Sequence, residues 1–538
     1  MTIDWPILSL IVFSPLLGAA LLLALPKQRA RMLRWMAIFA TLVPLALSLV
    51  LYVDYDPSRP DDAYEERVEW IRIPLEKSAI GIGGTFELQF DYALSLDGLS
   101  LPLVLLTTVT ASMAAIASTS IRKRWKAYYI WLLILECGML GVFLARDLLL
   151  FFIYFEMTMI PMIFLIGIWG QMERERAATR FLLYNGLGSA LMLIAFVILI
   201  MTAGFSIEQA SGVLHYMYSG SYETIVSNLA DPQAYANLSA ASSVNPLYMS
   251  DGMRTSLFVI LLLAFGIKLP VFPLHTWMLD VHREAPAPVV MLHSGILLKM
   301  GAYGMIRFGL FAFPEEAQRF QAVLAVFGLI SLLYGAVIAF RHKELRLVLA
   351  YSSLSHMGIV LLGLASLNEI GMQGAVFQLV SHGLISALMF LLLGCIYERA
   401  GTTSIDELGG LAKAAPFLSG ALLLGGLASL GLPGLSGFVG ELLALLGLFD
   451  SNQTVASIAV LGIILTAVYV LRAVMATTFG PLQPKLEGIR DARFVEALPT
   501  AVLLAFVLLL GIYPSFVTDM IKYSFDGLLN HLNTRVGG

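Results

Sequence analysis

Charge and cysteine are both scarce in this sequence. Only 13% of its 538 residues are Asp, Glu, Lys or Arg, against about 25% in ordinary soluble domains. The hydrophobic share is 58% and the mean hydropathy is +0.83, values that predict a membrane protein. The two cysteines, Cys137 and Cys395, stand far apart in apolar runs, which excludes a CxxC pair, an iron–sulfur motif and a disulfide framework. We therefore expect neither a cofactor nor a metal in this chain.

Motifs of soluble nucleotide-binding proteins are also missing. No GxGxxG opens a βαβ unit, no P-loop is present, and no basic patch with interleaved aromatic residues suggests a nucleic-acid partner. The longest polar segments, 54–93 and 204–254, hold about 40 to 50 residues, fewer than the roughly 100 of an ordinary domain. We therefore expect a single membrane domain over 1–538, whose function lies between its helices.

Long apolar runs recur along the whole chain. A helix needs about 20 apolar residues to cross a bilayer. The first run carries Asp4 where a signal peptide has basic residues, and is read as a membrane helix. The pattern predicts an all-α polytopic membrane protein of about 14 transmembrane helices. Their expected centres are residues 15, 43, 107, 135, 158, 190, 264, 299, 329, 355, 386, 430, 467 and 508.

The charges of the loops give an independent test of this topology. If the spans alternate from an outside N-terminus, one set of loops collects most of the Lys and Arg, in PKQRARMLR, SIRKRWK, GQMERERAATR, RHKELR and PKLEGIRDAR. Cytoplasmic loops carry such an excess. The sorting predicts that both termini and the segments 54–93 and 204–254 lie outside.

Eight ionisable residues interrupt the apolar runs. A lysine at a helix centre costs about 2.5 to 3.5 kcal/mol, so each such residue is a functional hypothesis by default. A structural role, by snorkelling or by a helix-to-helix ion pair, is equally open for Arg472 and Glu136, and a satisfied hydrogen bond remains an alternative for the histidines. The eight are Glu136, Glu156, Lys268, Lys299, His356, His382, Glu441 and Arg472.

Two of these residues stand beside predicted helix breaks. Lys268 is followed by Pro270 and Pro273 in GIKLPVFPLHTW, and Glu441 is preceded by SLGLPGLSGFVG. In the second stretch we expect Gly431, Pro433, Gly434 and Gly437 to interrupt the helix. A broken helix at membrane depth must line protein or water, and it points to an ion site. The recurrence of the break suggests an internal repeat.

These residues can form a proton path. Glu156 opposite Lys268 would be a switchable charge pair, because losing a partner's charge changes the proton affinity of a buried lysine. Lys299, His356 and His382 would continue the line toward Glu441. Bridging groups would be water or the hydroxyls of Tyr351, Ser352, Ser353 and Ser355. A different class, haem ligation by His356 and His382, is open but much less favoured.

Five stretches carry a recognisable pattern: FFIYFEMTMIPMIFLIGIWG, GIKLPVFPLHTWMLDVHREAPAPVVMLHSGILLKMGAYGMIRF, LAYSSLSHMG, VSHGLISALMFLLLG and SLGLPGLSGFVGE. With these stretches, nearly the whole chain resembles the antiporter-like subunits of respiratory complex I. This resemblance implies two inverted five-helix repeats, about 126–311 and 318–480, each with a discontinuous helix. Glu441 in place of lysine, FDYALSLDGLSLPLVLLT and the lack of a long C-terminal extension make the chain similar to the M-type subunits.

The resemblance also implies roles. Glu156 and Lys268 would be the charge pair, Lys299 the central relay, His356 and His382 relay histidines, and Glu441 the terminal group. The implied function is proton translocation driven by redox chemistry in other subunits of NADH:quinone oxidoreductase. Its setting would be the bacterial cytoplasmic membrane, between two flanking antiporter-like subunits.

Two features keep other interpretations open. His293, in MLHSGILLKM, departs from the commoner family pattern and suggests a modified relay branch. A subunit of a Mrp-type Na+/H+ antiporter or of a membrane-bound hydrogenase shares this fold, and a non-pumping assembly scaffold remains an alternative.

Overall fold

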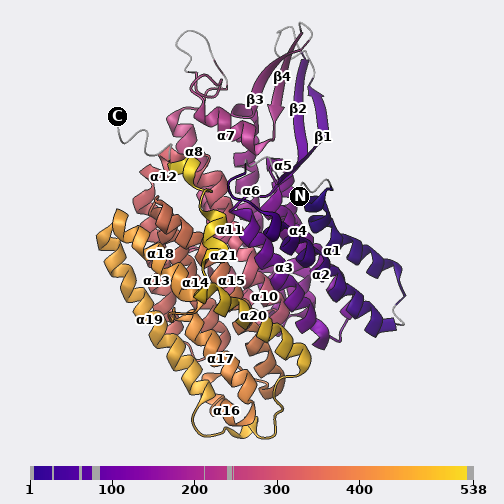
Figure 1. Cartoon of the computed structure of the whole chain (residues 1–538), viewed down its shortest axis with the longest axis vertical. Helices are drawn as coiled ribbons and strands as arrows, with labels where there is room; N and C mark the ends of the chain where they lie inside the picture. Colours follow the sequence, from indigo (N-terminus) through magenta and orange to yellow (C-terminus); the bar gives the residue numbers. More distant parts are fainter. Residues whose placement is uncertain are drawn as a thin grey trace.

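A computed structural model describes residues 5–26, 29–59, 64–75, 85–210, 213–238, 245 and 247–529. It consists of a large helical bundle that carries a small β-sheet at one end (Figure 1). The helices dominate, as the sequence predicts, and their apolar surfaces pack against one another around a continuous core.

Twelve helical stretches in the described part of the chain are long and apolar enough to cross a membrane. Each contains one of the centres expected from the sequence. They are α1 (Ile7–Ala24), α2 (Ala30–Asp54), α3 (Ser100–Ala117), α4 (Trp125–Leu144), α5 (Leu148–Trp169), α6 (Arg174–Thr202), the stretch Ala287–Leu310, α13 (Gln321–Arg341), α14 (Leu345–Ala365), α15 (Glu369–Ala400), α19 (Gln453–Thr478) and α20 (Phe494–Ile512).

Two further spans are broken, which brings the described spans to the predicted fourteen. The first consists of α8 (Asp251–Lys268) and α9 (Thr276–Glu284), and the second of α17 (Pro416–Ser429) and α18 (Ser436–Ser451). The first break follows Lys268, as expected. The second break is shorter than expected, because Gly437 lies inside α18 and not in the break. A Cβ on Gly437 would lie 2.1 Å from the Ala428 carbonyl oxygen, so this glycine permits close packing of α17 on α18.

The stretch Ala287–Leu310 is itself irregular. It runs through α10 (Ala287–Leu292), the π-helical η5 (His293–Leu297), α11 (Leu298–Gly304) and the π-helical η6 (Met305–Leu310). Such π-helical turns are rare and frequently occur at functional sites. Lys299 therefore lies between two of them.

A four-stranded sheet joins the two long polar segments, which the sequence analysis left without structure. Its order is β1 (Glu65–Leu75), β2 (Thr85–Ser95), β4 (Val213–Ser219) and β3 (Phe205–Ala210). The outer pairs are antiparallel hairpins, and β2 pairs in parallel with β4. The segments predicted to lie on one side of the membrane thus pair with each other.

Short helices complete the fold. They are α7 (Tyr222–Ala230), α12 (Pro314–Arg319), α16 (Leu411–Ala414), α21 (Ser515–Ile521) and the 3-10 turns η4 (Ser118–Ser120), η7 (Ile405–Glu407) and η8 (Pro484–Leu486).

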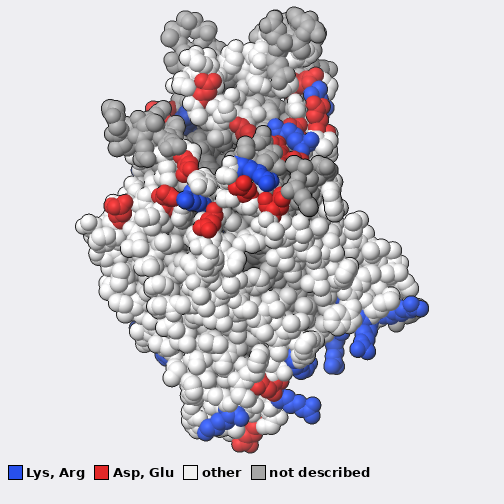
Figure 2. Space-filling model, viewed as in Figure 1, with Lys and Arg blue, Asp and Glu red and all other residues white. Residues whose placement is uncertain are grey.

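The charged side chains are sorted along the long axis of the molecule. Figure 2 shows a broad belt with almost no charge, a mixed acidic and basic surface toward the sheet, and a mainly basic surface at the other end. The belt is what a bilayer requires, so the chain is a multi-pass membrane protein.

Candidate functional site

Lys268 is the last residue of α8 and is almost completely buried, at 2% exposure. The carboxyl end of a helix favours a cation, which makes the break a suitable place for a lysine. The indole Nε1 of Trp277, on α9, donates to the carbonyl of Ile267 at 3.1 Å. This contact satisfies a backbone group freed by the break, as a buried break requires.

Lys268 and Glu156 do not form an ion pair in this structure. Among the described residues, the Lys268 Nζ and the Glu156 Oε1 have no hydrogen-bonding partner. The ammonium lies instead 4.7 Å from the centre of the Phe155 ring, a cation–π contact. Glu156 lies on α5, one residue from Phe155, and its charge acts on Lys268. The predicted pair is thus adjacent but open.

Lys299 makes direct contact with one of the predicted histidines. Its Nζ lies 2.8 Å from Nδ1 of His382, on α15, and also donates to the backbone carbonyl of Ser294. Because an ammonium has only donors, His382 accepts through Nδ1 when Lys299 is charged, and its own proton then sits on Nε2.

The line continues from His382 to Glu441. The His382 and His356 ring centres are 5.2 Å apart, and Nε2 of His356 lies 3.3 Å from Oε1 of Glu441. Both ring nitrogens of His356 also face carbonyl oxygens, of Ser352 at 2.7 Å and of Ser429 at 3.0 Å. Only an imidazolium can donate on both sides, so this environment suits a charged ring. It also leaves neither nitrogen free for haem.

A glycine makes room for the Glu441 carboxylate. Gly431, in the break before α18, has a φ of +76°, and a Cβ there would lie 2.6 Å from Oε2 of Glu441. The break therefore serves the site directly, since the backbone approaches the carboxylate where no side chain fits.

The expected bridging hydroxyls divide into two groups. Ser353 lies 3.2 Å from Ser294, beside Lys299, and Ser352 receives a hydrogen bond from Tyr469 at 2.8 Å beside His356. Ser355 donates instead to the Leu332 carbonyl, and Tyr351 stacks on the His342 ring. The structure thus brings two of the four hydroxyls to the line.

Glu136 and Arg472 lie apart from these contacts. Glu136 is fully buried on α4, and neither of its carboxylate oxygens has a partner among the described residues. Arg472 is exposed on α19, lies over the Phe340 ring and donates to the Phe340 carbonyl. The structural interpretation of Arg472 fits this position.

Two histidines with no assigned role in the sequence analysis belong to this region. His275 lies in the break after Lys268 and is buried, and neither of its ring nitrogens has a partner in the described chain. His282, on α9, contacts His293 at 3.0 Å. His282 stands next to Arg283 and Glu284, and this charged neighbourhood conceals its burial in the sequence.

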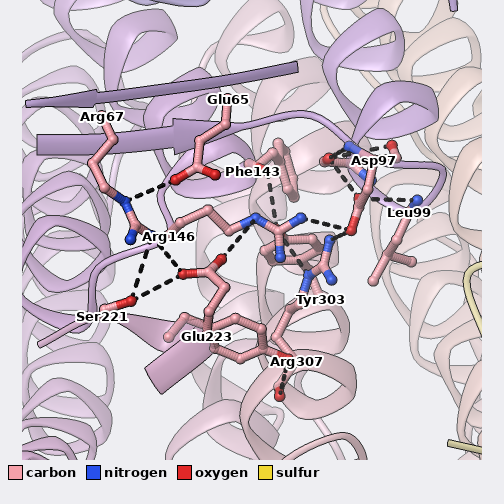
Figure 3. Close-up of polar contacts among 12 residues, drawn as sticks. Glu65, Arg67, Asp97, Leu99, Phe143, Arg146, Ser221, Glu223, Tyr303 and Arg307 are labelled. Carbon is pink, nitrogen blue, oxygen red and sulfur yellow. Dashed lines mark hydrogen bonds and ion pairs between the residues drawn. The ribbon is translucent and has the colours of Figure 1, made fainter. Parts of the chain in front are cut away.

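A second charged cluster lies at the sheet end of the bundle (Figure 3). Several of its residues border a cavity of about 800 Å³. Arg146 donates to Asp97 at 2.8 Å, Arg307 donates to the same carboxylate, and Arg67 pairs with Glu223 at 2.9 Å. Burial alone would raise the pKa of Asp97, but Arg307 and Arg146 together hold that pKa well below its ordinary value. These residues come from segments far apart in the sequence, and no motif marks them as a group.

This sheet-end network reaches the helix that carries Lys299. Arg307 belongs to η6 and donates through Nε to the Tyr303 hydroxyl at 3.2 Å. Tyr303, on α11, donates in turn to the Phe143 carbonyl at 3.0 Å. The sheet end of the irregular span is therefore held by polar contacts on two elements.

Broken helices, buried lysines and a histidine-linked carboxylate on one bundle define a class of protein, the antiporter-like membrane subunits. The comparisons agree. Residues 145–466 match the family model described as NADH:quinone oxidoreductase/Mrp antiporter, TM, and the chain belongs to that family.

Relatives extend over nearly the whole chain. NADH-quinone oxidoreductase subunit M of Rhodobacter capsulatus is 36% identical over 99% of this chain and 98% of its own length. NAD(P)H-quinone oxidoreductase chain 4 1 of Synechococcus sp. (strain JA-2-3B'a(2-13)) is 37% identical over 96% of this chain and 91% of its own length. A chain of respiratory complex I from Thermus thermophilus with bound NADH superposes with a TM-score of 0.78 at 30% identity, covering 97% of this chain and 99% of that one. The Mrp complex from Dietzia sp. DQ12-45-1b has the same fold, with a TM-score of 0.76 at 20% identity.

Proposed function

We propose that this chain is a proton-translocating, antiporter-like subunit of an NADH:quinone oxidoreductase, without redox chemistry of its own. The observation that carries the proposal is the buried sequence of contacts from Lys299 through His382 and His356 to Glu441. The subunit M and chain 4 relatives support the placement in this complex.

Lys268 and Glu156 form the input of the path. Bringing the two charges to about 4 Å, at an effective dielectric near 20, stabilises the charged lysine by about 4 kcal/mol. Moving one charge against 100 mV costs about 2.3 kcal/mol. Closing and opening the pair is therefore strong enough to load and unload Lys268. The open arrangement of the pair supports such a switch.

The order of transfer follows the contacts. A proton released by Lys268 reaches Lys299, passes to His382 and His356, and ends at Glu441. Glu156 and Glu441 lie on α5 and α18, helices that also expose large apolar side chains such as Ile160 and Phe449. We assign these flanks to two neighbouring antiporter-like subunits of the membrane arm.

Orientation and symmetry follow the same reasoning. The mainly basic end is the cytoplasmic end, which places the sheet, the start of α1 and the end of the described chain after α21 outside (Figures 1 and 2). The chain enters its first break from the sheet end through α8 and its second from the other end through α17. Opposite directions of this kind support two inverted repeats, about 126–311 and 318–480.

The decisive experiment compares Lys268→Ala with Lys343→Ala in membrane vesicles. Lys343 is exposed and pairs with Asp406 at 2.7 Å, so its loss serves as the matched control. Native gels establish assembly, and proton pumping and quinone reduction are measured together. We expect both activities to fall only in Lys268→Ala. Unchanged activities in an assembled Lys268→Ala complex would replace the pumping role with that of an assembly scaffold.

A further inference from the structure

Two buried histidines, His282 and His293, come between Lys268 and Lys299 in the sequence. Nε2 of His282, on α9, and Nδ1 of His293, the first residue of η5, are 3.0 Å apart, and their rings are nearly perpendicular. Neither residue has any exposed surface. This contact, here named the His282–His293 dyad, joins the second half of one broken span to the first π-helical turn of the next.

Aromatic contacts connect the dyad to Lys268. The His293 ring lies 5.4 Å from that of Trp277 and 6.1 Å from that of Phe181, centre to centre. The Lys268 ammonium lies 5.7 Å from the same Phe181 ring, and Trp277 donates to the carbonyl next to Lys268. His293 therefore shares its walls with the buried lysine.

The other side of the dyad faces the rest of the path. His282 lies 4.9 Å, centre to centre, from Phe390 on α15, the helix that supplies His382 to Lys299. The charge of Lys299 acts on both histidines, and that of Lys268 acts on His293. The dyad thus lies within electrostatic range of both lysines.

The hydrogen-bonding pattern of the dyad permits proton transfer. A neutral imidazole has one N–H donor and one acceptor nitrogen, so the single shared proton sits on either of the two facing nitrogens. The two other nitrogens, Nε2 of His293 and Nδ1 of His282, have no partner among the described residues. One of them can receive a proton while the other releases one.

We propose that the His282–His293 dyad relays protons between Lys268 and Lys299, an inference that rests on the proposed function. The ammonium of Lys268 gives a proton to Nε2 of His293, directly or through water. The N–H bond at Nδ1 of His293 breaks as one forms at Nε2 of His282. Nδ1 of His282 then releases its proton to the neutral amine of Lys299.

After one transfer, the protons of the dyad must return to their first positions before a second proton can pass in the same direction. One proton leaves Lys268 and one arrives at Lys299, while the dyad stays neutral with its shared proton reversed. The first arrangement returns when each ring gives its Nε2 proton to water and takes a proton from water at Nδ1, because rotation about the Cβ–Cγ bond does not exchange the two ring nitrogens. The relay therefore passes one proton in a given direction per reset.

Three variants test the relay: His293→Leu, His293→Gln and His282→Gln. Glutamine retains a donor and an acceptor but cannot pass a proton through its side chain, whereas leucine matches the apolar walls. His215→Gln, in β4 at the sheet end, is the control for loss of a histidine. Assembly, proton pumping and quinone reduction are measured in vesicles as for Lys268→Ala.

We expect all three variants to assemble and to pump about a hundredfold more slowly, the lower end of what a positioned proton carrier contributes. Normal pumping by His293→Gln overturns the relay, because it leaves only a structural hydrogen bond. Normal pumping by His293→Leu overturns both the relay and a structural role for the hydrogen bond between His282 and His293. If leucine prevents assembly, the two glutamine variants decide. Lys268→Ala distinguishes failure of the relay from failure of the proposed function. If only the dyad is dispensable, the histidine variants pump normally while Lys268→Ala remains defective.

Discussion

Buried charged residues occur in two regions of the molecule, the sheet end and the helical bundle, and the two regions differ in whether these residues are paired. At the sheet end, Asp97 binds two guanidiniums and Glu223 binds Arg67, so the charges of this network are paired. Within the bundle, the Lys268 Nζ and the Glu156 Oε1 stand without hydrogen-bonding partners among the described residues. Buried unpaired charge is costly, and chains tolerate it where the protonation state must change. Paired charges here hold elements together, and unpaired ones are available to titrate.

The largest expected effect comes from replacing Asp97, the carboxylate at the centre of the paired network. Asp97→Asn leaves Arg146 and Arg307 buried without their carboxylate, and loss of one partner of a buried pair costs about 3 to 5 kcal/mol. We expect a large fall in the midpoint of thermal unfolding and poor assembly on native gels. Asp406→Asn, at an exposed pair, is the control. Wild-type stability of Asp97→Asn would mean that the network does not hold the fold.

Glu441→Gln tests the other side of the comparison. The amide keeps the size of the side chain but cannot carry the charge that faces His356 at 3.3 Å. We expect normal assembly and pumping reduced by roughly a hundredfold, within the range for loss of a proton-transfer group. Exposed Glu369→Gln is the control. A Glu441→Gln protein that unfolds early but pumps normally per assembled complex would assign Glu441 to structure.

Parts of this arrangement could be predicted from the sequence because they depend on local rules. The breaks after Lys268 and before Glu441 follow from proline and glycine, and the ionisable positions stand out against apolar runs. The sequence therefore predicts that Lys299, His356, His382 and Glu441 belong to one group.

Other parts depend on contacts between distant segments. The order in which His382 precedes His356 is set by the packing of α14 and α15, and the pairing of β2 with β4 joins residues over 100 positions apart. His282, on α9, and His293, at the start of η5, come together across the short connection between α9 and α10. Such geometry comes from tertiary packing, which no periodicity in the sequence encodes.

The pH dependence of stability distinguishes two carboxylates at the sheet end, Asp147 and Asp97. Burial raises the pKa of Asp147 to about 6, although backbone N–H groups at the start of α5 oppose the shift. The folded state thus binds a proton that the unfolded state releases, so this residue makes stability fall as pH rises from about 4 to about 6, by at most about 3 kcal/mol. The pKa of Asp97 is lowered, so its contribution is present above its ordinary pKa and is lost only in stronger acid.

The measurement is the unfolding midpoint of wild type and Asp147→Asn between pH 4 and pH 6.5. We expect the difference between the two proteins to grow in favour of the variant as pH rises. A constant difference would show that Asp147 does not titrate in this range.

The smallest effect should come from the rim of the paired network. Glu223 is about half exposed, at 46%, and its ion pairs with Arg67 and Arg146 are 2.9 and 4.0 Å long. Exposed pairs contribute about 0.2 to 1 kcal/mol, so Glu223→Gln should shift the unfolding midpoint slightly and leave pumping unchanged. Glu65→Gln, at the neighbouring pair with Arg67, should behave alike. A loss as large as that of Asp97→Asn would mean that the network acts as one unit, from the sheet to Arg307 on the span of Lys299.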